Sequence, residues 1–312
     1  MTVLPIRFER LWEFYKKQRA LGWEPEEVRL GQDRKDWESL NADERYFVEN
    51  VLGFFARGDG YVVANLMDQF VDEVKPLEAK YNFVYQAQIE QVHSEVYARL
   101  VDFYIGDAAR RDALLARSGE IPAVRRKTDW IRTWMDPRNG TFGERLFAFA
   151  VVEGVLFSGS FCAIYWLKER GLMPGLAHAN DLIARDEGMH TDFAVLLNEH
   201  LAAPERATTA RAHAIMRGAV ETEKSFILDS IPCRLVGMNH GLMARYIEFV
   251  ADRLLVQFGH PPLYRSKNPF EFMERISMRA KKNFFEGEVA EYGKANVGLN
   301  EGDMEVAFTD DF

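Results

Sequence analysis

The sequence predicts an all-α protein built as a large helical bundle, and three observations support this prediction. Apolar residues recur with helical spacing along most of the 312 residues, whereas the alternation typical of strands is nearly absent. Proline and glycine residues separate one helical stretch from the next. Residues 146–167 are apolar on every helical face, which is typical of a helix buried inside a bundle.

Two long helices are expected in the first third of the chain. A capping box at residues 41–44 opens the first helix, which runs to about residue 74 and ends before Pro76. The second helix covers about residues 78–105 and ends at a Gly-Asp turn. Residues 107–140 are more polar, and we expect shorter helices there.

The rest of the sequence follows the same pattern. The apolar helix ends near Gly171, and further helices are expected over residues 177–201, 206–229, 241–258 and 269–292. Residues 293–312 are rich in glycine and acidic residues, so they cannot form a core of their own. We therefore expect a single domain over residues 1–292 and a flexible, disordered C-terminal tail over residues 293–312.

The apolar stretch over residues 146–167 is long enough to cross a membrane. Glu153 is its only charged residue, and a carboxylate is costly near the centre of a bilayer. The whole protein has a mean hydropathy of −0.25 and offers no second stretch of this kind. We therefore expect a buried helix and no membrane partner, with Glu153 facing a group that compensates its charge.

The composition favours a globular protein and excludes several classes of partner. Hydrophobic residues make up 47% of the sequence, which is enough for a sizeable core. The net charge of −9 argues against nucleic acid as a partner, because phosphates require a basic surface. Cys162 and Cys233 are the only cysteines, and residues 1–17 lack the apolar core of a signal peptide. We therefore expect no disulfide framework and a cytoplasmic location.

Two Glu-x-x-His motifs, at residues 90–93 and 187–190, carry the strongest chemical signal. The i, i+3 spacing places both side chains of a motif on one face of a helix. One such motif is weak evidence, because a solvated surface pair gives the same pattern. Here, however, each motif follows a stretch with an acidic residue in an apolar run, Asp59 in one case and Glu153 in the other. The sequence thus repeats one unit, a carboxylate helix followed by a Glu-x-x-His helix.

This repeat is the ligand arrangement of a di-metal carboxylate bundle. Four carboxylates and two imidazoles favour iron or manganese over a structural zinc ion. Two bound ions would also neutralise acids that apolar walls alone cannot stabilise. The competing explanation is a chance pair of surface motifs together with buried structural acids. The six predicted metal ligands are Asp59, Glu90, His93, Glu153, Glu187 and His190.

Tyr97 lies on the same helical face as Glu90 and His93, one turn beyond His93. By itself, this position indicates a core tyrosine. Beside a metal pair that activates oxygen, its phenol would be the most easily oxidised side chain within reach.

Several longer stretches resemble the small, radical-generating subunit of class I ribonucleotide reductase, most closely its eukaryote-like branch. The resemblance covers nearly the whole sequence, from Tyr15 to Phe312. The stretches that carry it include GWEPEEV from Gly22, FFARGDG from Phe54, VHSEVY from Val92, VEGVLFSGSF from Val152 and RDEGMH from Arg185.

The resemblance implies a ferritin-like bundle that forms a homodimer, with extra helices and two iron ions per protomer at the six predicted ligands. The di-metal centre would activate O2 to generate a tyrosyl radical on Tyr97. The radical would pass to the large catalytic subunit, where ribonucleotides are reduced to deoxyribonucleotides. The protein would then be the small subunit of ribonucleoside-diphosphate reductase, an oxidoreductase. The resemblance also implies an apolar pocket around the radical, formed by Phe157, Phe161 and Ile183.

A transfer route for the radical also follows from the resemblance. The route would run from His93 through Asp186 to Trp23, and Tyr292 would hand the radical to the large subunit. The tail would bind that subunit, and Phe308 and Phe312 are spaced so that both could enter one hydrophobic groove.

Two other classes of function share part of this pattern. A stand-alone di-iron oxidase or monooxygenase on the same bundle would explain the ligands, but not the tail, Tyr292 or Trp23. Aspartate at position 59 also fits the reductase better than most oxygenases, which have glutamate there. An iron-storage protein would need an entry path for ions, and the apolar surroundings of Glu153 argue against one.

Overall fold

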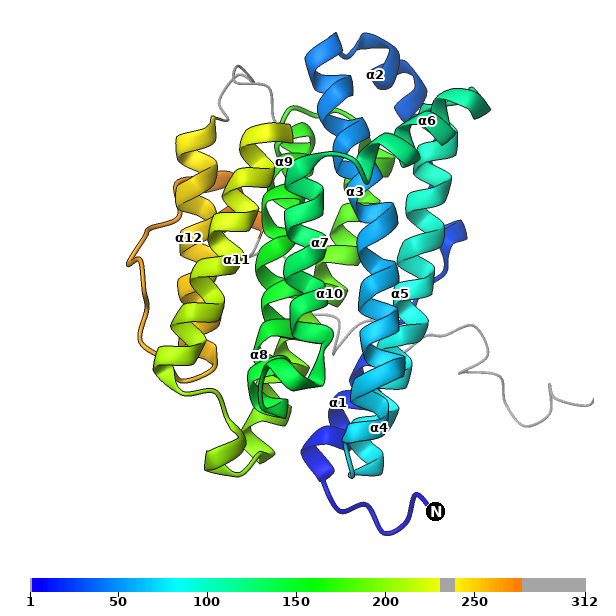
Figure 1. The fold of residues 1–312 in the computed structure, drawn as a ribbon. Helices are drawn as coiled ribbons and strands as arrows, with labels where there is room; N and C mark the ends of the chain where they lie inside the picture. The colour runs from blue at the N-terminus through cyan, green and yellow to red at the C-terminus, as the bar shows by residue number, and fades with distance from the viewer. Residues whose placement is uncertain (1, 231–238, 277–312) are drawn as a thin grey trace, which may run out of the picture. The chain divides into compact units, whose positions relative to one another are not determined.

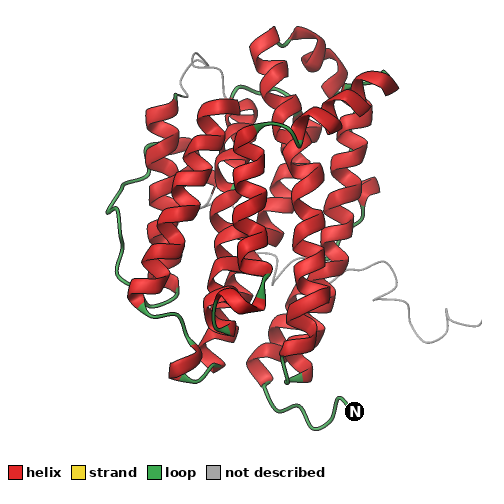
Figure 2. Cartoon of the chain, in the orientation of Figure 1, coloured by secondary structure: helices red, strands yellow, loops and turns green. Residues whose placement is uncertain are grey.

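The computed structural model describes residues 2–230 and 239–276, except for the side chains of residues 57–59, 118 and 230. These residues form helices joined by loops, with no strand among them (Figures 1 and 2). The predicted all-α class is therefore confirmed. By their internal contacts, Met1–Phe270 make one compact unit and Glu271–Phe312 another. The predicted boundary at residue 292 and the tail lie outside the described residues.

The two long N-terminal helices begin and end close to where the sequence predicts. Helix α3 spans Ala42–Asn65, and it continues through the π-helical segment η2 (Leu66–Phe70) into α4 (Val71–Glu73). Asn41 caps α3: its Oδ1 accepts from the backbone N–H of Glu44 at 2.9 Å, and its own N–H donates to Glu44 Oε2 at 3.0 Å. Helix α5 spans Leu77–Tyr104 and follows Pro76.

The remaining helices complete the bundle. Two of them, α1 (Glu9–Ala20) and α2 (Asp33–Ser39), have no counterpart in the sequence prediction. The last predicted helix, over residues 269–292, lies mostly outside the described residues. The other helices are α6 (Ala108–Ser118), α7 (Pro122–Met135), α10 (Pro174–His200), α11 (Thr209–Ser230) and α12 (His240–Gln257), with short 3-10 turns at η1 (Pro25–Glu27), η3 (Pro137–Asn139) and η5 (Ala203–Glu205).

The long apolar segment differs from its prediction in one respect. It is not one regular helix: α8 (Phe142–Val151) and α9 (Ser158–Glu169) are joined by the π-helical turn η4 (Val152–Leu156). This segment is the one helical stretch in the described residues that is long and apolar enough to cross a membrane, and 94% of its apolar window is buried inside the protein. The prediction of a buried helix is thus confirmed. A π-helical turn inside an α-helix commonly marks a functional position, and here it carries Glu153.

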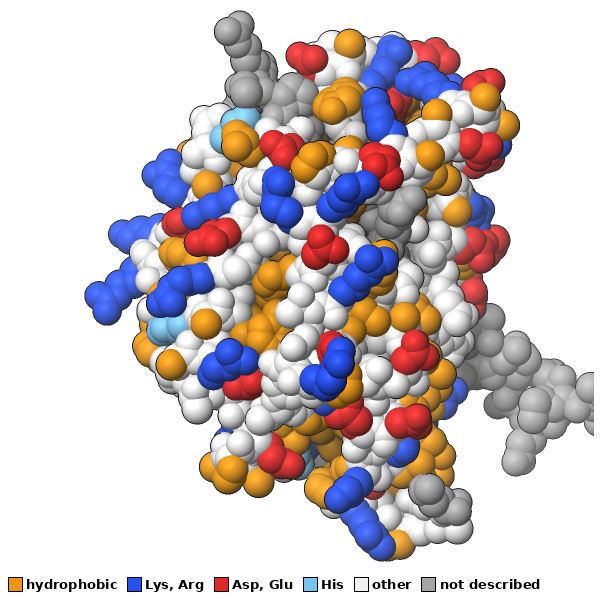
Figure 3. Space-filling model, viewed as in Figure 1, with side chains coloured by type: hydrophobic (Ala, Val, Ile, Leu, Met, Phe, Trp, Pro, Cys, Tyr) orange, Lys and Arg blue, Asp and Glu red, His pale blue; other side chains and the backbone are white. Residues whose placement is uncertain are grey.

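Packing between helices brings together the four segments that carry the predicted ligands. Helix α3 packs along α5, and α10 packs against α5, α8 and η4 (Figure 1). Phenylalanines dominate the largest fully buried side chains, and each contributes about 1.5–3 kcal/mol when it leaves water. Charged side chains of both signs are interspersed on the face of the bundle seen in Figure 3.

Asp33 connects α2 to the beginning of α10. Its side chain is fully buried, and it accepts hydrogen bonds from the backbone N–H groups of Gly175 and Leu176 at 2.7 and 2.8 Å. It also accepts from the hydroxyl of Tyr104 at 2.6 Å. These backbone N–H groups belong to the first turn of α10, which has no acceptor for them within the helix. Asp33 therefore caps α10 from a distant part of the sequence.

Replacing Asp33 with alanine should lower the free energy of unfolding by roughly 3 kcal/mol, because three buried donors lose a charged acceptor. Tyr104→Phe removes one of the three bonds and should cost about 1 kcal/mol. Urea denaturation of the metal-free proteins measures both values. Equal stability of Asp33→Ala and the unchanged protein would contradict the capping role.

Candidate metal centre

Three helical segments carry the predicted ligand side chains into the core of the bundle. Helix α5 carries Glu90 and His93, and helix α10 carries Glu187 and His190. In each pair the i, i+3 spacing directs both side chains to one face of the helix. The π-helical turn η4 carries Glu153. All five side chains are at most 4% exposed.

The two Glu-x-x-His pairs meet each other across the bundle. His93 Nδ1 lies 3.2 Å from Glu90 Oε2 and 3.4 Å from Glu187 Oε1. His190 Nδ1 lies 3.1 Å from Glu187 Oε2 and 3.0 Å from Glu90 Oε1. Each glutamate therefore contacts both histidines, and the Nδ1 atoms of both imidazoles face the carboxylates.

Glu153 completes the cluster. Four side chains can each direct one ligand atom into a common space, where these atoms lie within 4.8 Å of one another: Glu90, Glu153, Glu187 and His190. The structure thus brings together five of the six predicted ligands. Asp59 belongs to helix α3, but its side chain lies outside the described part of the protein, so its role as a ligand stays a prediction.

The close carboxylates and imidazoles perturb each other's ionisation. Burial alone would lower the pKa of His190, but the charge of Glu90 and hydrogen bonds to Glu187 and Glu90 raise it to about 9. The pKa of His93 is raised well above its usual range by the same glutamates and by Asp186, against the effect of burial. Burial would raise the pKa of Glu187, but a hydrogen bond shared with Glu153 and hydrogen bonds from the two histidines keep it well below its usual range. The buried acids thus attract positive charge.

These residues fit a metal pair. Carboxylate oxygens and imidazole nitrogens are ligands of iron and manganese, and the buried acids need a compensating positive charge that cations supply directly. Glu90 and Glu187 each contact both histidines, so both carboxylates would be available to hold the metal pair.

His93 is also connected to the outside of the cluster. Its Nε2 lies 3.1 Å from Asp186 Oδ2, and the same oxygen accepts from Trp23 Nε1 at 2.7 Å. When Nε2–H donates to Asp186, the lone pair of Nδ1 is left for a metal. The rings of Trp23 and His93 are stacked with centroids 6.0 Å apart. The structure thus brings His93, Asp186 and Trp23 into one continuous series of contacts.

Sequence reasoning missed two residues that support the site. Gln86 is buried and donates from Nε2 to Glu153 Oε1 at 2.9 Å. It lies one helical turn before Glu90 on α5, so its position on the ligand face was the available signal. Arg185 donates from Nη2 to Asp186 Oδ1 at 2.9 Å and to the carbonyl of Leu21 at 2.8 Å. It therefore connects Asp186 to the loop that holds Trp23.

Tyr97 is buried beside this cluster, one turn beyond His93 on α5. Its ring is stacked on that of Phe55, with centroids 4.6 Å apart and an interplanar angle of 11°. The rings of Phe157 and Phe161 in turn pack against that of Phe55, with centroids 5.7 and 5.2 Å from it. These aromatic rings form an apolar wall beside the phenol, and Ile183 is also buried. Tyr292 lies outside the described residues.

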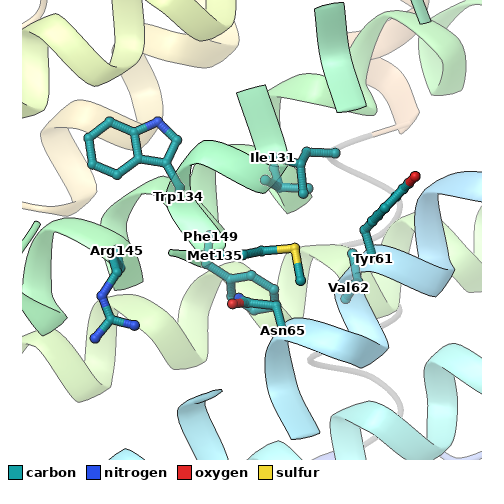
Figure 4. Close-up of a pocket in the computed structure, with 9 residues that line it drawn as sticks. Tyr61, Val62, Asn65, Ile131, Trp134, Met135, Arg145 and Phe149 are labelled. Carbon is teal, nitrogen blue, oxygen red and sulfur yellow. The ribbon is translucent and has the colours of Figure 1, made fainter. Parts of the chain in front are cut away.

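A separate cavity lies between α3, α7 and α8 (Figure 4). Its walls are mostly apolar, and its one buried charged residue, Arg145, pairs with Glu73. This cavity lacks the convergent ligands of the metal centre. The residues that line it are Tyr61, Val62, Asn65, Ile131, Trp134, Met135, Arg145, Phe149 and Val152.

Comparison with known proteins decides the family. Residues 1–269 match the model of the family described as ribonucleotide reductase, small chain. The protein belongs to this family. The resemblance seen in the sequence is thereby confirmed, and the protein is related to ribonucleotide reductase small chains over most of its length.

Several relatives that are nearly half identical to this protein come from eukaryotes. The small chain of ribonucleoside-diphosphate reductase from Nicotiana tabacum is 49% identical over 95% of this protein and 89% of its own length. Its counterpart from Encephalitozoon cuniculi is 47% identical over 100% of this protein and 94% of its own length. Among solved structures, the Rnr4 homodimer of ribonucleotide reductase from Saccharomyces cerevisiae superimposes on this protein with a TM-score of 0.81. The two sequences are 34% identical, and the match covers 91% of this protein and 90% of the yeast chain. The ferritin-like bundle is thereby confirmed.

Proposed function

We propose that this protein is the radical-generating small subunit of a ribonucleoside-diphosphate reductase. The buried Glu/His cluster beside Tyr97, joined through His93 to Asp186 and Trp23, carries the proposal. The stand-alone oxidase is not favoured, because the relatives are reductase small chains.

Each residue of the site has a distinct task in this proposal. The metal pair would be held by Asp59, the three glutamates and the two histidines. Iron is the proposed metal, with manganese as the alternative, and when bound it supplies the redox chemistry that activates O2. Tyr97 would then lose one electron and its phenolic proton and become the tyrosyl radical. The proposed ligands on the described helices are Glu90, His93, Glu153, Glu187 and His190.

The wall of aromatic rings gives Tyr97 the surroundings that a long-lived radical needs. Tyr97 is 3% exposed, and Phe55 covers one face of its ring. Water and small reductants are thereby kept from the phenol. We propose that the oxidising equivalent leaves in a controlled way, through His93, Asp186 and Trp23, and then through Tyr292 to the large subunit.

The assembly is also part of the proposal. The yeast structure that superimposes on this protein is a homodimer, and we propose a homodimer here. The large catalytic subunit would bind the tail at residues 293–312. The scarcity of cysteine favours a reducing location, which we propose to be the cytoplasm.

Metal loading tests the proposal. The protein is loaded with ferrous iron under argon and then exposed to air, after which bound iron is counted and an electron paramagnetic resonance spectrum is recorded. We expect two iron ions per protomer and a tyrosyl signal. One ion per protomer, or two ions with no radical under air, would contradict the proposal.

Asp186→Asn should separate radical formation from radical transfer. The amide keeps the shape of the side chain but loses the negative charge that pairs with His93 and Arg185. We expect the Tyr97 signal to persist and nucleotide reduction with a large subunit to fall at least about tenfold, which corresponds to about 1.4 kcal/mol of barrier. Asp192→Asn, a change two turns along α10 from this contact, serves as the control and should keep full turnover. Unchanged turnover in Asp186→Asn would contradict the route.

Deleting residues 306–312 should remove turnover while leaving the metals and the radical intact. The segment includes Phe308 and Phe312, and burying two phenylalanines could contribute about 3–6 kcal/mol to docking. A synthetic peptide of the deleted segment should inhibit the complex by competition. Normal binding of the truncated protein to the large subunit would show that the tail has no docking role.

A further inference from the structure

Four easily oxidised aromatic side chains lie side by side on α1 and α5, outside the metal centre. Trp12 and Tyr15 are one turn apart on α1, and Tyr81 and Tyr85 are one turn apart on α5, which packs along α1. The ring centroids of Tyr85 and Tyr15 are 6.4 Å apart, and Tyr15 lies 5.5 Å from Tyr81 and 5.3 Å from Trp12. Phenol and indole rings therefore follow one another without a gap. We call these four residues the α1–α5 aromatic series.

The inner end of this series reaches the surroundings of the metal centre. Tyr85 lines a small cavity together with Asp186 and His190. Asp186 contacts His93, and His190 is a predicted metal ligand. Met189 lines the same cavity. A phenol, a thioether and two groups of the metal site thus share one space.

The position of Tyr85 depends on Gly22. A Cβ atom at residue 22 would lie 2.5 Å from the Tyr85 hydroxyl oxygen, so the hydroxyl occupies the space that any larger residue would need. Gly22 directly precedes Trp23, whose indole donates to Asp186. The tyrosine is therefore fitted against the loop that holds the proposed transfer route.

We propose that the α1–α5 aromatic series is a second electron-transfer route, through which oxidising equivalents that Tyr97 does not capture leave the metal site for the protein surface. This proposal rests on the proposed function, because the oxidant is the one generated when the loaded site reacts with O2. All four residues of the series are partly exposed, whereas Tyr97 is buried. Reductants in solution can therefore reach them.

The transfer balances at each residue. Tyr85 gives one electron to the oxidised site and its phenolic proton to water, and becomes a neutral phenoxyl radical. Burial and the charge of Asp186 raise the pKa of this phenol, so it begins protonated at neutral pH. Tyr15 then reduces Tyr85, which regains a proton from water, and the oxidising equivalent moves on to Tyr81 or Trp12. An external one-electron reductant such as ascorbate finally restores the outermost residue.

The consequence for the protein would be protection of the site. Without this exit, an uncaptured oxidant would attack other oxidisable side chains close to the site. Met189 is the candidate, because it shares the cavity with Asp186, His190 and Tyr85. Two oxidising equivalents would remove two electrons from its thioether, and water would supply the oxygen atom and release two protons, which gives a polar sulfoxide in a buried position.

Freeze-quench electron paramagnetic resonance of Tyr97→Phe tests the route, because that variant leaves the oxidant without its normal target. After iron loading and exposure to O2, we expect a transient tyrosyl signal that narrows when ring-deuterated tyrosine is incorporated. The signal should disappear in Tyr97→Phe/Tyr85→Phe and persist in Tyr97→Phe/Tyr61→Phe. Tyr61 is the matched control, since it is a partly exposed tyrosine on α3 outside the series. A signal unaffected by Tyr85→Phe, or no signal in Tyr97→Phe, would overturn the proposal.

Mass spectrometry gives a second readout that does not depend on activity. Over repeated cycles of iron loading and exposure to O2, Tyr85→Phe should accumulate several-fold more sulfoxide at Met189 than either the unchanged protein or Tyr61→Phe. Gly22→Ala should act in the same direction, because it displaces the phenol without removing it. Equal oxidation of Met189 in Tyr85→Phe and Tyr61→Phe would overturn the protective role.

The same measurements separate this proposal from the proposed function. If the unchanged protein forms no Tyr97 radical, the proposed function fails. If it forms that radical but Tyr85→Phe changes neither the transient signal nor Met189 oxidation, only the second route fails.

Discussion

Replacing Tyr97 with phenylalanine should abolish the stable tyrosyl radical while leaving two metal ions bound. The substitution removes one hydroxyl and no ring volume, so the contact with Phe55 and the packing of α5 are kept. We expect a change in the free energy of unfolding of no more than about 1–1.5 kcal/mol. Nucleotide reduction with the large subunit should fall to background, because the small subunit would then have no stored oxidising equivalent to deliver.

Tyr104→Phe is the matched control for this prediction. Tyr104 lies on the same helix, two turns beyond Tyr97, and it is also buried. Its hydroxyl donates to Asp33 and not to the site, so its removal should affect stability but not the radical. A stable tyrosyl signal of unchanged shape in Tyr97→Phe would show that another tyrosine carries the radical.

Replacing Glu153 with alanine should reduce bound iron from two ions to at most one per protomer. Glu153 is 2% exposed and shares the ligand space with Glu90, Glu187 and His190. No neighbouring residue on η4 can take its place, because the residues around it on this turn are apolar. The radical should be lost together with the second ion.

Glu49→Ala provides the comparison for a buried carboxylate outside the site. Glu49 is 8% exposed and pairs with Arg110 at the surface of α3. Its removal should leave the iron content at two per protomer, as measured by elemental analysis after gel filtration. Two firmly bound ions in Glu153→Ala would remove Glu153 from the ligand set.

Local patterns in the sequence were sufficient for much of the fold. Three features depend only on residues close in sequence: the cap at Asn41, the break at Pro76 and the helical faces of the two Glu-x-x-His motifs. The structure has all of them. The burial of the apolar segment was also predictable, because a helix without a polar face lies in a protein core or in a membrane, and Glu153 and the polar remainder of the sequence favoured the core.

The features that were missed depend on contacts between distant parts of the sequence. The π-helical turn at η4 adds a residue to the apolar helix, which its hydrophobic pattern alone does not reveal. Helix α2 is only seven residues long, and Asp33 joins it to α10 through the backbone N–H of Gly175, 142 residues away. Gln86 likewise acquires its role only when η4 packs near α5 and brings Glu153 to its amide.

The relation between radical content and turnover tests the central claim most directly. Preparations of the unchanged protein are loaded with increasing amounts of ferrous iron under argon, exposed to air, and quantified for the Tyr97 radical by electron paramagnetic resonance. Each is then assayed for deoxyribonucleoside diphosphate with a ribonucleotide reductase large subunit. We expect a turnover rate proportional to the radical content, with no turnover at zero radical. Turnover that does not depend on the radical, or a full radical content without turnover, would contradict the proposal that the Tyr97 radical drives nucleotide reduction.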